Sequence, residues 1–261
     1  MNTVKIRNVV IGEGIPKICV PIVGKTKHQI IREALKLENM HVDIVEWRVD
    51  YFEDALEVEK IKEVLFELTS VLNNIPLLFT LRTANEGGKK EIHKNEYVKI
   101  NKIISVSGLV DLMDVEVLTG DEEVADIIKT AQASGVKVIA SNHDFEKTPV
   151  KNEIIHRLRK MQELGADILK IAVMPKSKLD VLELMTSIVK ANEEYIDRPI
   201  VAVAMSDLGV VTRFIGEMFG SSLTFGSVGQ SSAPGQIESD ALYEALQITH
   251  KILNNKPVSE F

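Results

Sequence analysis

The residue that most directly suggests chemistry in this sequence is Lys170, which lies inside the apolar run ILKIAVM at residues 168–174. Most lysines carry their ammonium group to solvent from the protein surface, and that is the alternative interpretation here. The apolar neighbours leave little room for a solvated side chain, and burial favours the neutral amine of a lysine. A neutral amine can attack a carbonyl carbon and form a Schiff base. We therefore predict imine chemistry at Lys170.

A candidate acid–base residue, His143, follows the apolar run VKVIAS at residues 136–141. A lone histidine is often a hydrogen-bonded core residue, but this one ends the predicted strand before the strand of Lys170. Adjacent strands lie about 4.8 Å apart, so both side chains could contact one small ligand. Imidazole titrates near neutral pH, which suits a group that removes and returns a proton. Glu86, in the loop after an earlier strand, is a candidate partner that orients the imidazole, although most loop glutamates are solvated.

Three arginines, Arg48, Arg82 and Arg213, lie at or after the ends of three different predicted strands. Single arginines in such places mostly form surface salt bridges. Three that converge on one site indicate an anionic substrate, because the guanidinium group matches a carboxylate or a phosphate. Further polar candidates at the ends of predicted strands are Glu46, Ser232 and Gln236.

The strands and helices that must position these residues can be predicted from the sequence, in which short apolar runs alternate with longer amphipathic runs. The apolar runs are rich in Val and Ile, as in strands that are buried on both faces. The runs between them have apolar residues at helical spacing. We predict strands at residues 16–24, 42–50, 75–83, 109–117, 136–144, 168–175, 199–206 and 222–228.

Eight strand–helix units in 261 residues match the size of a (β/α)8 TIM barrel, which is an α/β fold. We expect one barrel domain over residues 1–261, with the polar candidates at the C-terminal ends of the strands, where such barrels place their active sites. Residues 3–14 look like a β-hairpin that caps the bottom of the barrel, with Gly12 and Gly14 turning the chain. An open doubly wound sheet is the alternative, but it normally has a glycine cluster after its first strand. The corresponding turn, VGKTKHQ at residues 23–29, has one glycine.

The composition excludes several classes of protein and site. The 31 Lys and Arg residues against 38 Asp and Glu give a net charge of −7, which argues against a nucleic-acid or membrane partner. The single cysteine, Cys19, rules out a disulfide framework and a multi-cysteine zinc site. No segment resembles a secretion signal or a membrane span, and no His or carboxylate cluster has metal-like spacing. We therefore expect a soluble, cytoplasmic protein without a metal.

Six motifs together resemble those of the type I 3-dehydroquinate dehydratase family. They span nearly the whole chain, occur in the order found in the family, and fall on successive strand ends. The motifs are EWRVD (46–50), FTLRT (79–83) followed by Glu86, SNHDF (141–145), LKIAVMP (169–175), MSDLGVVTR (205–213) followed by Phe214, and SSAPGQ (231–236).

The resemblance implies a homodimeric (β/α)8 barrel that needs no metal or organic cofactor and dehydrates 3-dehydroquinate to 3-dehydroshikimate in the shikimate pathway. It implies that Lys170 forms an imine with the substrate ketone. His143 would remove the C2 proton and help hydroxide leave from C1 in a syn elimination, with Glu86 as its partner. The implied substrate contacts are Arg213 and Gln236 at the carboxylate, assisted by Arg82 and Ser232, with Glu46 and Arg48 at the ring hydroxyls and Met205 and Phe145 as apolar walls. One departure is Pro21, where some relatives are expected to have a small polar residue.

Two other functions stay open from the residues alone. A Schiff-base aldolase on the same barrel would also use a lysine of the sixth strand, and Arg213 would suit a phosphate as well as a carboxylate. A non-catalytic barrel that binds a small acid would keep the arginines but would not need Lys170 beside His143. Product analysis separates the two enzymes, because dehydration creates an enone that absorbs ultraviolet light, whereas aldol cleavage yields two fragments.

Overall fold

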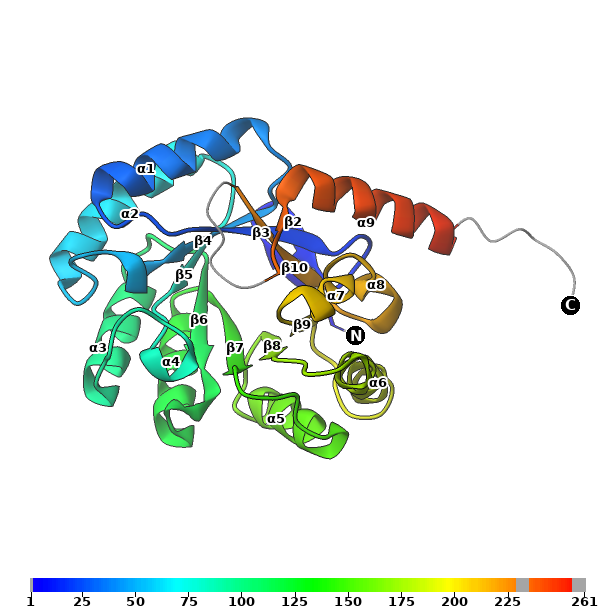
Figure 1. Ribbon diagram of the computed structural model, residues 1–261. Coiled ribbons are helices and arrows are strands. Elements are labelled where there is room, and N and C mark those ends of the chain that lie inside the picture. Colours follow the sequence, from blue (N-terminus) through cyan, green and yellow to red (C-terminus); the bar gives the residue numbers. More distant parts are fainter. Residues whose placement is uncertain (1, 229–234, 255–261) are drawn as a thin grey trace, which may run out of the picture.

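The computed structural model describes residues 2–228 and 235–254, in which a curled parallel sheet is surrounded by helices (Figure 1). Eight strands lie side by side in the order β10-β3-β4-β5-β6-β7-β8-β9. Each lies within the corresponding stretch predicted from the sequence and is shorter than that stretch, by about half in β4, β5 and β6. The strands are β3 (Lys17–Ile22), β4 (Ile44–Arg48), β5 (Leu77–Thr80), β6 (Leu112–Glu116), β7 (Lys137–Asp144), β8 (Ile168–Val173), β9 (Ile200–Ala204) and β10 (Leu223–Ser227).

The curled sheet closes between β9 and β10. The backbone amide of Ser222 donates a hydrogen bond to the carbonyl of Ile200 over 2.8 Å. The hydroxyl of Ser221 accepts the backbone amide of Ala202 over 3.1 Å. These contacts join the two edge strands of the curled sheet, and the predicted (β/α)8 barrel is confirmed.

The strands are buried on both faces, which explains their nearly continuous apolar sequences. In β4, for example, all five residues are buried. Trp47 packs outward against the helix layer, in a core that includes Ile61 and Leu65, whereas Ile44 belongs to a separate core inside the barrel. The alternation along β4 therefore sends Glu46 and Arg48 to the inside as well.

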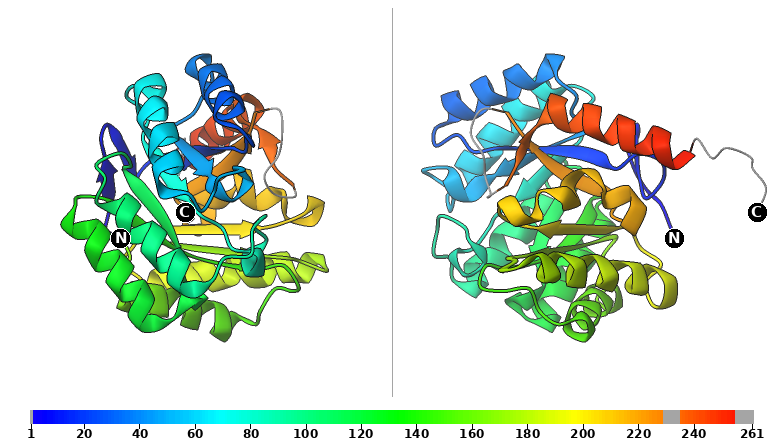
Figure 2. Two further views of the ribbon diagram at one scale, coloured as in Figure 1. Left: turned by 90° about the vertical axis from the view of Figure 1, so that its left-hand side faces the viewer. Right: turned by 45° about the vertical axis from the view of Figure 1, so that its right-hand side comes forward.

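Helices follow the strands and form the outer layer of the barrel (Figure 2). Their amphipathic sequences place apolar residues toward the strands, as the predicted helical spacing requires. The capping boxes at Thr26 and Ser177 fix the first turns of two of them. The helices are α1 (Lys27–Lys36), α2 (Val58–Leu72), α3 (Lys94–Ser105), α4 (Asp121–Ala133), α5 (Lys151–Glu163), α6 (Lys178–Glu194), α7 (Val211–Phe214), α8 (Gly216–Phe219) and α9 (Ser239–Asn254).

The N-terminal hairpin closes one end of the barrel, as predicted. Strand β1 (Val4–Ile6) pairs antiparallel with β2 (Val9–Ile11), and in the left view of Figure 2 the dark blue hairpin lies at the tails of the barrel strands. The buried side chains of β1 and β2 share one core with inward-facing residues near the start of every barrel strand. These barrel residues are Cys19, Ile44, Leu78, Leu112, Ile139, Ile168, Val201 and Leu223. Gly12 and Gly14, both with positive φ, turn the chain from the hairpin toward β3.

The inward-facing side chains change from apolar to polar along the strands. Past the layer that contacts the hairpin, the interior contains the buried side chains of Glu46, Asp114, Ser141 and Lys170. This polar layer lies toward the C-terminal ends of the strands, which is the end where barrels of this type form sites.

The last strand–helix units are less regular than the sequence suggested. Two short helices, α7 and α8, follow β9, and α8 ends at Phe219 because the next residue, Gly220, has a φ of +87°. After β10, the two-residue strand β11 (Ile237–Glu238) pairs with the end of β10 and leads into α9. Over the two described ranges, none of the helices combines the length and the apolar character needed to cross a membrane.

Candidate active site

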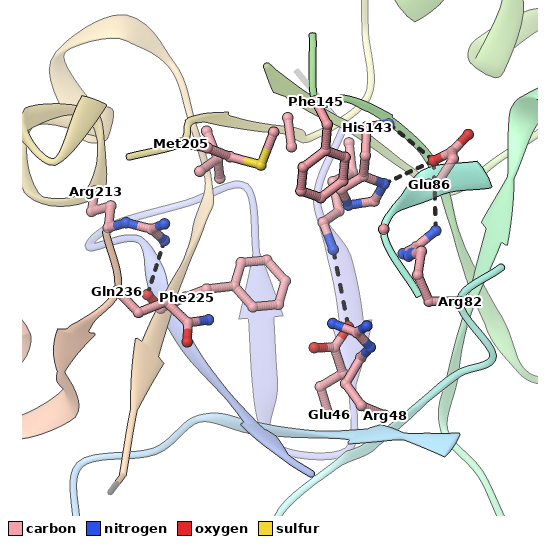
Figure 3. A pocket seen from close by; sticks show the side chains of 14 residues that line it. Glu46, Arg48, Arg82, Glu86, His143, Phe145, Met205, Arg213, Phe225 and Gln236 are labelled. Carbon is pink, nitrogen blue, oxygen red and sulfur yellow. Dashed lines mark hydrogen bonds and ion pairs between the residues drawn. The ribbon is translucent and has the colours of Figure 1, made fainter. Parts of the chain in front are cut away.

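A pocket lies at the C-terminal end of the barrel, above the polar part of its interior (Figure 3). Ten of the eleven site residues predicted from the sequence line this pocket, together with Gly87, Ala172, Val203 and Phe225. The eleventh, Ser232, lies outside the described residues. The ten are Glu46, Arg48, Arg82, Glu86, His143, Phe145, Lys170, Met205, Arg213 and Gln236.

Lys170 lies in the middle of β8 and is 5% exposed. Its Nζ lies 3.4 Å from Oδ2 of Asp114 and 4.0 Å from Oε1 of Glu46. The same nitrogen lies 4.2 Å from the centre of the Phe225 ring. The two carboxylates and the aromatic face stabilise positive charge on this nitrogen. These surroundings suit the cationic protonated imine, and they counter the preference for a neutral amine that was expected from burial alone.

His143 and Glu86 form a hydrogen-bonded pair on one side of the pocket. Nδ1 of His143 lies 2.8 Å from Oε2 of Glu86, and the same oxygen accepts the backbone amide of His143 over 2.9 Å. Glu86 ends a short 3₁₀ turn after β5, at Ala84–Glu86, and is 5% exposed. A carboxylate that accepts from Nδ1–H leaves Nε2 of the imidazole as the free base.

The surroundings of this pair shift both pKa values. Burial, together with the positive charges of Arg82, Lys170 and Arg48, holds the pKa of His143 well below its ordinary value of 6.5. Burial raises the pKa of the Glu86 carboxyl, against the opposing charge of Arg82. Because the pKa of Glu86 is raised to about 8 and the two groups share a hydrogen bond, the pair titrates as a unit. The form of the pair that can act as a base has a neutral imidazole and an ionised carboxylate that accepts its N–H group.

Arg82 connects the pocket to the carboxylates of β6. Its Nη2 donates to Oδ1 of Asp114 over 2.7 Å, and its Nη1 donates to Oε1 of Glu116 over 3.1 Å and to Oγ of Ser141 over 3.0 Å. Burial opposes the ionisation of Asp114, but the charges of Arg82 and Lys170 outweigh it and hold the pKa of Asp114 below its usual range. Asp114 is therefore negatively charged and joins Arg82 to Lys170.

Glu46 and Arg48, two residues apart in β4, are each fixed by a buried partner. Nε and Nη2 of Arg48 donate to the two carboxylate oxygens of Asp50 over 2.8 and 2.9 Å. Asp50 is fully buried and also accepts the backbone amide of Lys89 over 3.0 Å. Glu46 accepts the hydroxyl of Thr80 over 2.8 Å. Both side chains are thus held in place before a ligand arrives.

Arg213 and Gln236 lie next to each other across the pocket from Arg82 and Glu86 (Figure 3). Arg213 comes from α7 and is 2% exposed, and its Nη1 donates to the carbonyl of Phe225 over 3.3 Å. Burial lowers the pKa of Arg213 to about 10, so the guanidinium remains charged at neutral pH. A buried cation beside an amide is suited to binding a carboxylate.

Comparison with protein families decides between the functions that the sequence left open. A family model described as type I 3-dehydroquinase matches residues 18–253. The chain belongs to this family. The resemblance stated from the six motifs is therefore confirmed.

Relatives in this family match nearly the full length of the chain. The 3-dehydroquinate dehydratase of Clostridioides difficile (strain 630) is 52% identical over 251 residues, which cover 96% of this chain and 98% of the relative. The enzyme of the same name from Bacillus licheniformis is 47% identical over 250 residues, which cover 96% and 98%.

Solved structures of the family have the same fold. The type I 3-dehydroquinate dehydratase from Clostridium difficile, in a crystal structure with covalently modified comenic acid, superposes with a TM-score of 0.94 at 51% identity. The alignment covers 96% of this chain and 99% of that one. The 3-dehydroquinate dehydratase from Geobacillus kaustophilus superposes with a TM-score of 0.93 at 36% identity, covering 98% of both chains.

The apolar walls expected for this type I 3-dehydroquinase line the pocket. Met205 is 2% exposed, and Phe145 is 40% exposed. The ring of Phe145 lies against Gly87, where an added Cβ atom would clash with ring carbons of the phenylalanine. Gly87 has a φ of +83°, so both its conformation and its lack of a side chain are needed here.

Several residues that shape the pocket were not selected from the sequence. The most important are Asp114 and Glu116. Both lie in the predicted apolar strand at residues 109–117, and neither was assigned a function from the sequence. Their spacing is informative, because residues two apart in a strand share a face, and a charge inside a barrel needs a partner. Phe225 and Asp50 were also missed, since nothing in the sequence indicates that they contact Lys170 and Arg48.

Two residues left open by the sequence do not line the pocket. Cys19 is fully buried in the core beside the hairpin, and burial raises the pKa of its thiol well above the usual value. Pro21 pairs with Glu46 between β3 and β4 but does not line the pocket. In the part of the chain that the structure describes, no three His, Cys, Asp or Glu side chains are grouped to hold a metal ion.

Proposed function

We propose that this chain dehydrates 3-dehydroquinate to 3-dehydroshikimate through an imine on Lys170, with His143 as the general acid and base. The observation that carries this proposal is that the buried amine of Lys170 and the Glu86–His143 pair line one pocket. The dehydratase names of relatives about 50% identical support the substrate and the reaction.

The first stage is formation of the imine. The amine nitrogen of Lys170 attacks the C3 carbonyl carbon of the substrate, and the carbonyl oxygen leaves as water after proton transfers. The product is a protonated imine whose nitrogen is still the former Nζ. Asp114 and Glu46 lie 3.4 and 4.0 Å from this atom, so their negative charges stabilise the iminium cation.

The second stage is the elimination. The iminium withdraws electrons from C2, and Nε2 of His143 removes the C2 proton to give an enamine. The electron pair of the enamine then expels the C1 hydroxyl group, which takes the proton back from His143 and leaves as water. Because one residue acts in both steps, both groups leave from one face of the ring, which is a syn elimination. A second water hydrolyses the imine, releasing 3-dehydroshikimate and the free amine of Lys170.

The substrate is held by the charged residues around the reacting atoms. We assign the carboxylate to Arg213 and Gln236, with Ser232 assisting. Arg82, which the resemblance implied as a further contact of the carboxylate, lies across the pocket and donates to Asp114 and Glu116 instead. The ring hydroxyls are assigned to Glu46 and Arg48, and the apolar walls to Met205 and Phe145. The buried charge of Arg213 and the fixed positions of Glu46 and Arg48 support this assignment.

The alternative functions have less support. A Schiff-base aldolase would also use a lysine, but this chain belongs to the type I 3-dehydroquinase family. A non-catalytic barrel would not need a histidine whose Nδ1 is held by a buried carboxylate beside the lysine. We therefore retain the dehydratase as the proposed activity.

We also propose that residues 1–261 form one domain, that the protein is a cytoplasmic homodimer, and that catalysis needs no metal or organic cofactor. Light scattering of the purified protein tests the dimer and should give twice the mass of a 29.0 kDa chain. Activity should survive prolonged dialysis against a metal chelator. A mass of 29.0 kDa would contradict the dimer, and loss of activity that is restored by a metal would contradict the proposal that no metal is needed.

A direct test is to mix purified protein with 3-dehydroquinate and follow the ultraviolet absorbance of the enone product. We expect steady enone formation by the wild-type chain and none by Lys170→Ala. Cleavage into two fragments would support the aldolase instead. Binding of the substrate without any change in it would support the non-catalytic barrel.

A further inference from the structure

We propose that Asn142, held by Arg157, is a positioning residue for Glu86 and thereby for His143. This proposal rests on the function proposed above and adds a layer of residues behind its acid–base pair. Asn142 lies in β7 and is 1% exposed. Its neighbour Ser141 contacts Arg82 inside the barrel, so strand alternation directs Asn142 to the other side, where it contacts Arg157 of α5.

The contact with Arg157 decides which way the amide of Asn142 points. Nη1 of Arg157 lies 2.8 Å from Oδ1 of Asn142. A guanidinium group has only hydrogen-bond donors, so the atom that faces it must be the amide oxygen. The amide nitrogen of Asn142 must then face the other way, and it lies 3.4 Å from Oε1 of Glu86.

Arg157 is itself held in place. Its Nε donates to Oε1 of Glu153, one turn earlier in α5, over 2.8 Å. Its Nη1 also lies 3.5 Å from Oδ2 of Asp144, and the side chain is 19% exposed. Two carboxylates therefore fix the guanidinium that fixes the amide.

The two oxygens of Glu86 consequently have different partners. Oε1 accepts from Asn142, while Oε2 accepts the backbone amide and faces Nδ1 of His143. This division sets the rotation of the carboxyl group and keeps Oε2 on the imidazole. The charged groups that face Glu86 from other elements are Arg82, at 3.7 Å, and the carboxylates of Asp114 and Glu116.

If the amide turned around, its oxygen would face the carboxylate of Glu86 at close range. Two oxygens that both accept hydrogen bonds repel each other, and the carboxyl would then hold a proton more tightly. A protonated Glu86 would donate to Nδ1 and leave the proton of His143 on Nε2, which is the wrong tautomer for a base. The amide orientation is thus linked to catalysis rather than only to packing.

The first test is Asn142→Asp, which keeps the shape of the side chain but replaces the N–H donor by an oxygen. We expect kcat to fall about tenfold or more, because part of the acid–base contribution is lost. The acid limb of the pH profile of kcat/KM should move to higher pH, since Glu86 and His143 would retain a proton more strongly. The imine should still be trapped on Lys170 with borohydride. A wild-type kcat with a wild-type pH profile would overturn the proposal.

The second test uses Arg157, whose side chain is partly exposed and lies outside the pocket. This test remains valid even if Asn142→Asp fails to fold. Arg157→Lys keeps a group that only donates, so it should hold the amide and preserve most of kcat. Arg157→Gln offers a carbonyl oxygen that permits the amide to turn, so it should lower kcat and shift the pH profile as Asn142→Asp does. The control is Arg159→Gln on the same helix, at an arginine that is 51% exposed, which should behave as wild type.

The outcomes separate this inference from the proposed function. If Arg157→Gln and Arg157→Lys both behave as wild type in an enzyme that dehydrates 3-dehydroquinate, the positioning role of Asn142 is wrong and the function stands. If the wild-type chain forms neither enone nor trapped imine, the function itself is wrong. If the pH profile shifts in Arg157→Gln but not in Arg157→Lys or Arg159→Gln, the positioning role of Asn142 is established.

Discussion

At the scale of single residues, the pocket is a set of buried charges that compensate each other. Lys170 is placed beside Asp114 at 3.4 Å, and the other oxygen of Asp114 accepts from Arg82 at 2.7 Å. A charge buried without a partner is strongly destabilising, so this chain of ion pairs is needed simply to keep the amine inside the barrel. It also means that the cationic imine forms in surroundings that are already negatively charged. The chemistry thus uses an arrangement that folding requires in any case.

The role of His143 predicts which steps fail when it is removed. In His143→Ala, the amine of Lys170 is unchanged, so the imine should still form. Proton removal from C2 and departure of the C1 hydroxyl should slow by roughly 10²–10⁴, the usual contribution of a general acid–base residue. Borohydride trapping measures the imine, and enone absorbance measures turnover. Turnover at the wild-type rate would contradict the assigned role.

The low pKa of His143 predicts the pH range of activity. Since burial and three nearby cations lower this pKa, the base stays unprotonated at pH values where a free imidazole would be charged. Its partner Glu86 must also be ionised and has a pKa raised to about 8, so the acid limb of kcat/KM belongs to the pair and should lie above the pKa of His143 alone. A pH series with 3-dehydroquinate on wild type and on Glu86→Gln tests this, and an acid limb that does not move to lower pH in the variant would contradict it.

At the scale of elements, the loops at the C-terminal ends of the strands give the pocket its walls, whereas the strands give it the reacting groups. The loop after β5 shows this division. It carries Glu86 at the end of a short 3₁₀ turn, and the next residue, Gly87, lies against the ring of Phe145. The loops after β5 and β7 are thus packed together at the mouth of the pocket.

Gly87→Ala tests this contact between the loops. The new Cβ would clash with ring carbons of Phe145, so the ring must move, and kcat/KM should fall about tenfold as the wall of the pocket changes. Gly108→Ala is the matched control, because its φ of +72° imposes a similar backbone strain of roughly 1–2 kcal/mol in a place with no neighbour within 4 Å. We expect both variants to lose stability but only Gly87→Ala to lose activity. Equal activity in the two would contradict the account.

The N-terminal hairpin is expected to stabilise the barrel without taking part in the chemistry. Ile11 is fully buried in the core that closes the far end of the barrel. Ile11→Ala should therefore lower the free energy of unfolding by roughly 2–5 kcal/mol, as measured by urea denaturation, and leave kcat unchanged. Lys5→Ala, at an exposed position of β1, is the control and should change stability by less than roughly 0.5 kcal/mol. A large loss of kcat in folded Ile11→Ala would show that the hairpin does affect the pocket.

At the scale of the whole molecule, the sequence predicted most of the architecture because barrel strands are buried on both faces. Such burial produces the continuous apolar runs from which all eight strands were identified. The rule that barrel sites lie at the C-terminal ends of strands then selected residues such as Lys170 and His143 without any coordinates. The family motifs supplied Met205 and Phe145, which no chemical argument would have chosen.

The contacts across the barrel could not be predicted in the same way. Asp114 lies in β6 and Lys170 in β8, so the two are not on neighbouring strands, and only the closed barrel brings them together. Likewise, the sequence does not show that Arg157 of α5 faces Asn142, because helical spacing gives the buried face of a helix but not its partners. The same limit applies to α7, a single turn too short to produce a periodic signal, which nevertheless positions Arg213.

The imine on Lys170 is tested most directly by intact-mass spectrometry after borohydride reduction in the presence of 3-dehydroquinate, on wild type and on Lys170→Ala. We expect one substrate-derived adduct on the wild-type chain, located at Lys170 by peptide mapping, and none on the variant. A wild-type chain that forms the enone product but carries no adduct, or carries it at another lysine, would contradict the proposed imine on Lys170.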